Sequence, residues 1–262
     1  MCNANKPIKR KIIYLSQTLL SKLINCKMNI STEKTPQQKL SNFSIKHVSA
    51  VNITHLLIHD LKDVAQASDE LNQQASCNKA IPHVAARNIK HKHELENFIK
   101  FCTLKGIDKA LVIGGSIPRH TSNIFQNDID VAKILKKANI KVDCGIYPQN
   151  ETELEIKTKL EFFNNAITQL CMDPQSINNL PFLNTIRIGL PSMCSVKGIF
   201  KYLKLCGNES YKYIFKNWKV LNYLGSNGIK VEEFVKKIKF NNYHIYNFGK
   251  LDETIRKLKE ID

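Results

Sequence analysis

Short apolar runs rich in Val and Ile recur along the chain, and stretches of helical periodicity separate them. Eight runs have the length and composition of strands, namely residues 11–16, 43–50, 79–86, 109–115, 141–147, 165–170, 184–190 and 243–248. Apolar strands that alternate with amphipathic helices are typical of parallel strands covered by helices. Eight such units, spaced by about 30 residues, predict an α/β fold of the (β/α)8 TIM-barrel type.

The N-terminal segment differs from the rest of the chain. It has no acidic residue before Glu33, and its first run, "KIIYLS" at 11–16, makes an uncertain or degenerate first strand. Residues 1–42 are therefore either a basic N-terminal arm or the first strand-helix unit, and residues 43–262 form the barrel domain. We expect a cytoplasmic protein, or one of the mitochondrial matrix if residues 1–27 are a targeting arm.

Composition narrows the partners. The 262 residues carry 39 Lys and Arg against 23 Asp and Glu, a formal charge of +16, but the lysines are scattered through helical stretches. This pattern favours a solvated basic surface over a patch for an anionic ligand, and it predicts no nucleic-acid partner. No segment has the length and hydropathy of a membrane span. The eight cysteines never form a Cys-x-x-Cys pair, which predicts reduced thiols without a zinc site.

In such a barrel, functional side chains follow the C-terminal ends of the strands. Gln169 and His83 interrupt apolar runs there, and a buried amide or imidazole without a partner costs about 1–3 kcal/mol. A structural hydrogen bond explains either residue alone. Several polar residues at equivalent strand ends instead favour the interpretation that they bind a ligand. His55 and His59, four apart on a predicted helix, are interpreted as surface histidines because no third metal ligand has a matching spacing.

Several motifs occur in the order found in one known family. They are "IPHVAARNI", "KALVIGGSIP", "CGIYPQ", "NAITQLCMD", "IRIGLPSMCSVKGIFKYLKLCG" and "YHIYNFGKL". Over residues 43–262 the chain resembles the methylenetetrahydrofolate reductase family, in a divergent branch. The resemblance implies a flavin-containing barrel that reduces 5,10-methylenetetrahydrofolate to 5-methyltetrahydrofolate in one-carbon and methionine metabolism, with FAD as cofactor and NAD(P)H as reductant.

The resemblance also implies roles for individual residues. Cofactor contacts are expected from His83, Gly114, Gly115, Ser116, Tyr147 and Lys159. Substrate contacts are expected from Gln169, Tyr246 and Lys250. Gln169 is expected to hydrogen-bond the pterin, because an amide offers both a donor and an acceptor. Lys159 is expected to face the flavin diphosphate, and Lys250 stands where the family has an arginine.

Three positions depart from the family pattern. Gly114, Gly115 and Ser116 replace Arg-Gly-Asp at the end of the fourth strand, and Gln149 replaces a glutamate. The general acid that the family carries on its first strand is absent from residues 11–16, so the catalytic residue is unassigned. Glu33 has a similar Ser-x-Glu context, but it lies too close to the predicted second strand to leave room for a helix between them.

Three hypotheses remain open. The first is a flavin-dependent folate reductase. The second is a folate-binding or methyl-transferring protein that has lost flavin chemistry, and the third is a basic barrel with a vestigial pocket. The folate is a small-molecule partner in the first two, and all three are compatible with a homo-oligomer.

Overall fold

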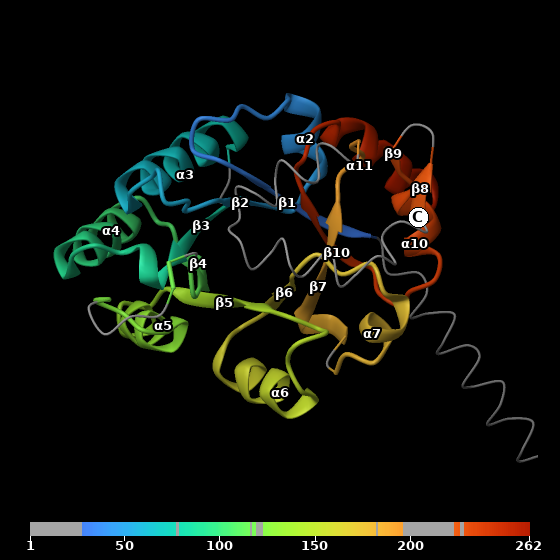
Figure 1. The fold of residues 1–262 in the computed structure, drawn as a ribbon. Helices are drawn as coiled ribbons and strands as arrows, with labels where there is room; N and C mark the ends of the chain where they lie inside the picture. The colour runs from blue at the N-terminus through green and yellow to red at the C-terminus, as the bar shows by residue number, and fades with distance from the viewer. Residues whose placement is uncertain are drawn as a thin grey trace, which may run out of the picture.

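The computed structural model describes residues 28–76, 79–115, 117–118, 123–181, 183–195, 223–225 and 228–262. Eight parallel strands close into a barrel in the order β1-β10-β7-β6-β5-β4-β3-β2 (Figure 1), which confirms the predicted TIM barrel. The barrel strands are β1 (Asn29–Lys34), β2 (Ala50–Ile53), β3 (Ala80–Ala85), β4 (Lys109–Ile113), β5 (Lys141–Ile146), β6 (Ala166–Thr168), β7 (Ile186–Pro191) and β10 (Asn242–Tyr246). A short hairpin, β8 (Leu224–Gly225) with β9 (Gly228–Ile229), lies between β7 and β10 in the sequence.

Helices surround the barrel and cover the outer face of the strands (Figure 1). They are α2 (Asn42–His47), α3 (Leu61–Ala75), α4 (Lys92–Leu104), α5 (Asp128–Lys137), α6 (Glu153–Phe162), α7 (Pro174–Asn178), α10 (Val231–Val235) and α11 (Leu251–Glu260), with 3-10 turns η1 (Ala86–Asn88) and η2 (Leu183–Thr185). Capping boxes at Asp60 and Thr152 begin α3 and α6, because each side chain accepts a hydrogen bond from a backbone N–H of the first turn. None of the described helices is long and apolar enough to cross a membrane.

The strand that closes the barrel at the N-terminal side is β1, at residues 29–34, and it pairs with both β10 and β2. The predicted first strand at 11–16 lies outside the described residues. Because side chains alternate along a strand and Ser31 pairs with the inward-facing Ala50, β1 directs Ser31 and Glu33 to the inner face of the barrel. A strand with polar residues on its inner face has no continuous apolar run, so its pattern in the sequence is weak.

The prediction of a strand over 43–50 is wrong for most of its length. Residues 42–47 form α2, which begins at Ser41, whose side chain accepts a hydrogen bond from the backbone N–H of Ser44. The second strand is β2, at 50–53. A helix of six residues therefore fits between β1 and β2, and the objection that Glu33 lies too close to the second strand does not hold.

The outer and inner faces of the barrel strands carry different kinds of side chain. The main hydrophobic core lies between the strands and the helices, whereas a small apolar cluster of Ala50, Ile81, Leu111 and Ile167 forms a second core on the opposite face of the strands. Other inward positions are polar and buried, notably on β10, β1 and β2. Burying polar groups without hydrogen-bond partners is unfavourable, so the buried polar residues on these three strands indicate a candidate ligand-binding site inside the barrel.

Charged residues also lie within the barrel wall away from the mouth. Asp143 of β5 is almost fully buried and pairs with Lys109 of β4 at 3.2 Å, while Asn165 donates to its second oxygen at 2.9 Å. Burial lowers the pKa of Arg187 on β7, and the charge of Asp143 partly opposes that shift. Lys109 and Asp143 compensate each other's charge, which is the arrangement that buried charges require, whereas Nη1 of Arg187 has no hydrogen-bond partner among the described residues.

Candidate functional site

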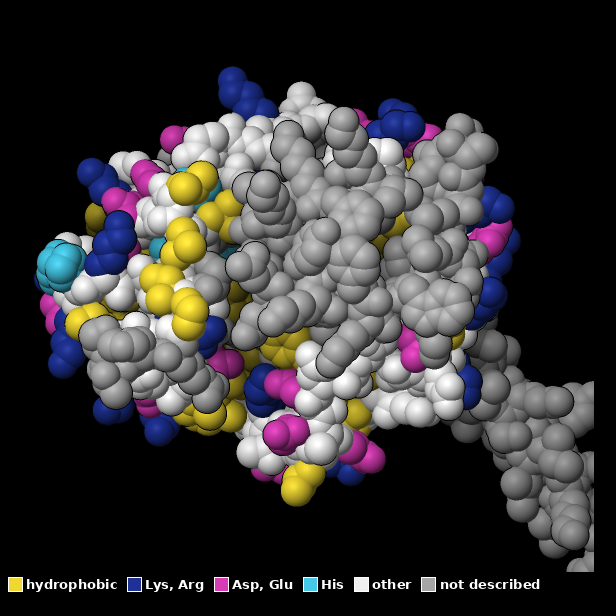
Figure 2. Space-filling view, in the orientation of Figure 1, with side chains coloured by type: hydrophobic (Ala, Val, Ile, Leu, Met, Phe, Trp, Pro, Cys, Tyr) yellow, Lys and Arg dark blue, Asp and Glu magenta, His cyan; other side chains and the backbone are white. Residues whose placement is uncertain are grey.

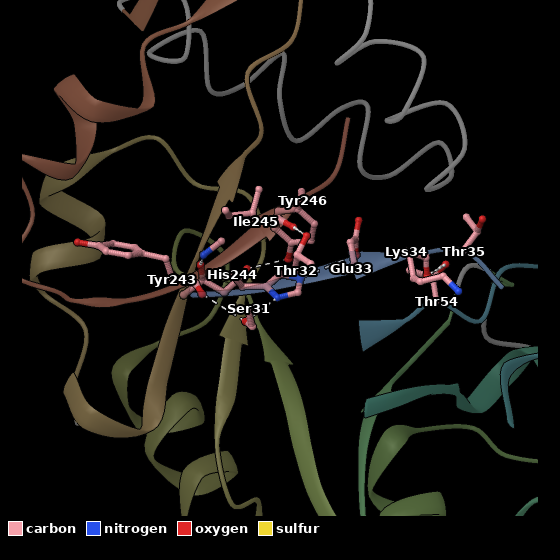
Figure 3. A network of polar contacts seen from close by, with 12 residues as sticks. Ser31, Thr32, Glu33, Lys34, Thr35, Thr54, Tyr243, His244, Ile245 and Tyr246 are labelled. Carbon is pink, nitrogen blue, oxygen red and sulfur yellow. Dashed lines mark hydrogen bonds and ion pairs between the residues drawn. The ribbon is translucent and has the colours of Figure 1, made fainter. Parts of the chain in front are cut away.

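A line of hydrogen-bonding side chains crosses from β1 to β10 inside the barrel (Figure 3). Ser31 Oγ lies 3.0 Å from His244 Nδ1, and His244 Nε2 lies 3.9 Å from Glu33 Oε2. Glu33 is 4% exposed and His244 1% exposed, so both are withdrawn from bulk water. The register pairs Ser31 with His244 on the neighbouring strand, and Glu33 lies two residues farther along β1 on the same face of the strand.

The serine fixes the tautomer of this histidine. The hydroxyl of Ser31 donates to the carbonyl oxygen of Tyr243 at 3.2 Å, so its oxygen accepts from His244 Nδ1–H. In neutral His244, Nε2 is then an acceptor directed toward Glu33. The 3.9 Å between Nε2 and Oε2 is longer than a hydrogen bond, so the two side chains face each other as a close buried pair.

The Tyr246 ring and the backbone of Gln169 both lie beside Gly189. The Tyr246 hydroxyl donates to the carbonyl oxygen of Thr168 at 2.8 Å, and its ring packs edge-on against His244 with centroids 5.1 Å apart. A Cβ at Gly189 would lie 2.5 Å from the Tyr246 ring and 3.4 Å from the carbonyl carbon of Gln169. Glycine at this position therefore lets the tyrosine cross β7, and it brings two predicted substrate residues into one neighbourhood with His244.

Unpartnered polar atoms gather at the ends of β2 and β3. Buried side-chain atoms without a hydrogen-bond partner among the described residues include both amide atoms of Asn52, Nε2 of His55 and of His83, and Oδ1 of Asn88. Burial lowers the pKa of His83 to about 3, with His244 and His55 adding to the shift, so the ring is neutral. An uncharged set of donors and acceptors matches the edge of a neutral heterocycle.

Sequence reasoning missed two members of this group. Asn52 lies inside a short strand, and His55 was assigned with His59 to the surface of a helix. Both histidines are instead buried, at 3% and 6% exposure, in the loop between β2 and α3. Burial lowers the pKa of His55 to about 4, although Glu94 opposes the shift. In the described part of the chain, no group of three His, Cys, Asp or Glu side chains has metal-binding geometry.

The Gly114-Gly115 turn is packed against protein groups from the end of β3. A Cβ at Gly114 would lie 2.6 Å from the guanidinium of Arg87, and one at Gly115 would lie 2.8 Å from Asn88 Oδ1. Arg87 donates hydrogen bonds to the carbonyl oxygens of Gly115 and Ile117. The space beside Gly114 and Gly115, where cofactor contacts are expected, is thus occupied by the side chains of Arg87 and Asn88. Ser116 lies outside the described residues.

The remaining predicted residues lie near other strand ends. Tyr147 follows β5, and the ammonium of Lys159 lies 5.9 Å from the centre of its ring. Lys159 also forms an ion pair with Glu151 and donates to the carbonyl oxygen of Gly145. Burial disfavours its charge, but Glu151 outweighs burial, and the pKa of Lys159 is raised. Lys250 is exposed at the start of α11, where it pairs with Glu253 at 3.6 Å.

Exposed hydrophobic side chains lie near the polar residues at the strand ends. Figure 2 shows them gathered on the part of this face near β3, β4 and α4. The loop after β2 exposes Leu57 by 53% and Ile58 by 81%, and Tyr147 after β5 is 41% exposed. An apolar border around a few convergent polar groups is typical of sites for flat organic ligands.

Comparison with known proteins supports the fold. No protein-family model and no curated protein matches the sequence. Among solved structures, the chain is similar to a protein from Aquifex aeolicus VF5, with a TM-score of 0.52 and 12% identity over 94% of this chain and 97% of that one. It is also similar to the GH18 chitinase ChiB from Flavobacterium johnsoniae, with a TM-score of 0.50 and 10% identity over 90% and 95% of the two chains. At such low identity these likenesses show the barrel fold alone.

Proposed function

We propose that the barrel mouth binds a reduced folate and reduces 5,10-methylenetetrahydrofolate, as the resemblance to the methylenetetrahydrofolate reductases implies. One observation carries the proposal. The carboxylate expected on the first strand is Glu33, which lies on β1 inside the barrel and faces His244. Its context, Ser31-x-Glu33, is similar to the one that the family carries on its first strand.

The residues of the chain have separate roles in this proposal. Glu33 acts as the general acid that donates a proton to open the methylene bridge of the folate. Ser31 orients His244 so that its Nε2 faces this carboxyl group and can accept or return the proton. Gln169, which directly follows β6, hydrogen-bonds the pterin edge through its amide. The low exposure of Glu33 and His244 excludes bulk water from the proton.

A bound flavin would supply the hydride in such a reaction. The neutral cluster of Asn52, His55 and His83 fits the ring of a flavin, because it presents buried donors and acceptors without charge. The described residues do not fit its diphosphate equally well. Lys159 is already neutralised by Glu151, and Arg87 fills the space beside Gly114.

This mismatch favours a second candidate function, a folate-binding protein that does not use FAD. Purified full-length protein distinguishes the two. Flavin absorbance that is bleached by NADH or NADPH and restored by methylenetetrahydrofolate supports the reductase, whereas tetrahydrofolate binding by colourless protein supports the second candidate. Failure to bind tetrahydrofolate, with or without added FAD, contradicts both.

The cellular location belongs to the same proposal. We infer a cytoplasmic protein that acts on a small-molecule folate, with the mitochondrial matrix as the alternative. Fractionation of cells that express the full chain, with detection by a C-terminal tag, tests this location.

A further inference from the structure

A cavity lies outside the barrel wall, against the end of β1. It has a volume of about 410 Å³, and its lining residues are Lys34, Pro36, Gln37, Gln38, Lys39, Leu40, Glu70, Leu71 and Gln74. The walls come from the segment between β1 and α2 and from α3. Because Glu33 points into the barrel, the next residue along the strand points outward, so this cavity and the barrel mouth are on opposite faces of β1.

Lys34 is the unusual member of this lining. The residue is only 8% exposed, and its ammonium makes one described hydrogen bond, to the carbonyl oxygen of Pro36 at 3.3 Å. An ammonium has three donors, so the remaining donors have no described protein acceptor. Burial lowers the pKa of Lys34, and the charge of Glu70 opposes this only in part. An exposed lysine would avoid this desolvation cost.

The strand holds Lys34 firmly in this position. Its carbonyl oxygen accepts from the backbone N–H of Thr54 at 2.9 Å and from the Thr54 hydroxyl at 3.3 Å, and Figure 3 shows the two residues side by side. The side chain therefore starts from a fixed point of the barrel wall. A fixed, partly desolvated ammonium is better suited to binding an anion than a mobile surface lysine.

We propose that this cavity binds a small organic ligand through a single carboxylate placed on Lys34. The lining carries two lysines against one glutamate, so its formal charge of +1 matches a monoanion better than a phosphate dianion. Gln37, Gln38 and Gln74 provide further donors and acceptors. Pro36, Leu40 and Leu71 provide an apolar wall, which indicates a short hydrocarbon body behind the carboxylate.

The proposal is tested on the full-length protein with isovalerate, which has one carboxylate and a branched apolar tail. NMR titration at constant ionic strength measures its Kd against those of isovaleramide, the uncharged isostere, and inorganic phosphate. We expect isovalerate to bind at least tenfold more tightly than either. Lys34→Met and Lys34→Gln should weaken isovalerate binding at least tenfold, Lys39→Met at the rim less, and Lys92→Met on α4 not at all.

The stability of the variants separates binding from folding. Removing an incompletely paired buried charge should leave the Tm of Lys34→Met equal to or above that of the wild type. This expectation does not depend on whether the barrel mouth binds a folate. Equal affinities for isovalerate and isovaleramide, or unchanged binding in both Lys34 variants, would overturn the site. Phosphate that binds as tightly as isovalerate would overturn the assignment to a carboxylate.

Discussion

Glu33 of β1 and His244 of β10 face each other inside the barrel, with 3.9 Å between Oε2 and Nε2. The chain separates these residues by more than two hundred positions, and only closure of the barrel through β1 and β10 joins them. Ser31 holds the other ring nitrogen of the histidine. The arrangement places a carboxyl group beside an imidazole inside the barrel, where both are withdrawn from bulk water.

Glu33→Gln should abolish most of the proposed folate reduction while leaving folate binding intact. Glutamine keeps the shape of the side chain but cannot donate a carboxylic proton, and loss of a general acid lowers rates by roughly 10²–10⁴-fold. Rapid-mixing measurement of methylenetetrahydrofolate reduction checks this, with the exposed Glu96→Gln on α4 as the matched control. A Glu33→Gln protein with wild-type turnover would remove Glu33 from the reaction.

Gln169→Ala should weaken tetrahydrofolate binding without unfolding the domain. Gln169 is half-buried, and deleting a hydrogen-bonding partner of a bound ligand costs about 1–3 kcal/mol, or roughly 10–100-fold in Kd. Isothermal titration calorimetry gives the Kd, and thermal unfolding gives the stability. Equal affinity in the variant and the wild type would exclude Gln169 from the site, and Gln126→Ala, before α5, is the control.

Ser31→Ala should release His244 from its single tautomer. The variant loses the acceptor for Nδ1–H and the bond to the Tyr243 carbonyl, which corresponds to about 1 kcal/mol of folding free energy. Urea unfolding measures the loss, and ¹⁵N chemical shifts of the imidazole report the tautomer. Unchanged ¹⁵N shifts would show that the serine does not orient this ring.

The protein should become less stable as the pH falls from about 6.5 toward 4. Burial lowers the folded-state pKa of His83 to about 3 and that of His55 to about 4, so the unfolded chain takes up these protons first. Each histidine should contribute roughly 1–2 kcal/mol of lost stability by pH 5.

Urea unfolding at pH 7 and pH 5 measures this loss. Carboxylates also titrate on acidification, so the informative quantity is the difference from the double variant His55→Gln/His83→Gln. The variant should show a smaller decrease in stability between the two pH values. Identical decreases would mean that the two rings are not buried in neutral form.

Gly115→Ala should destabilise the protein more than Gly114→Ala. Gly115 has a φ of +90°, which is strained for any other residue, and its Cβ would also meet Asn88. A Cβ at Gly114 meets the end of the Arg87 side chain, which can move aside. We expect a loss of at least about 1–2 kcal/mol at Gly115. Gly145→Ala, where the nearest atom is 3.6 Å away, is the control, and equal losses at Gly114 and Gly115 would contradict this account.

Apolar periodicity was sufficient to predict the barrel. Six of the predicted runs, from 79–86 to 243–248, coincide with strands that close it, and the helical periodicity between two of them corresponds to α4, which buries Leu95, Phe98 and Cys102. These elements bury one or both faces, so burial is visible in the residue pattern itself. The same pattern does not locate β1, whose inner positions are Ser31 and Glu33.

Tertiary structure alone decided the site. A strand that lines a polar cavity alternates without an apolar run, and the short α2 hides the spacing between β1 and β2. The Ser-x-Glu context of Glu33 is visible in the sequence, but the position of Glu33 on the first strand was set by pairing with β10 at the far end of the sequence. Burial of His55 and occupation of the Gly114 turn by Arg87 were likewise decided by packing between loops. Local sequence does not encode such contacts, because they depend on which strand ends become neighbours.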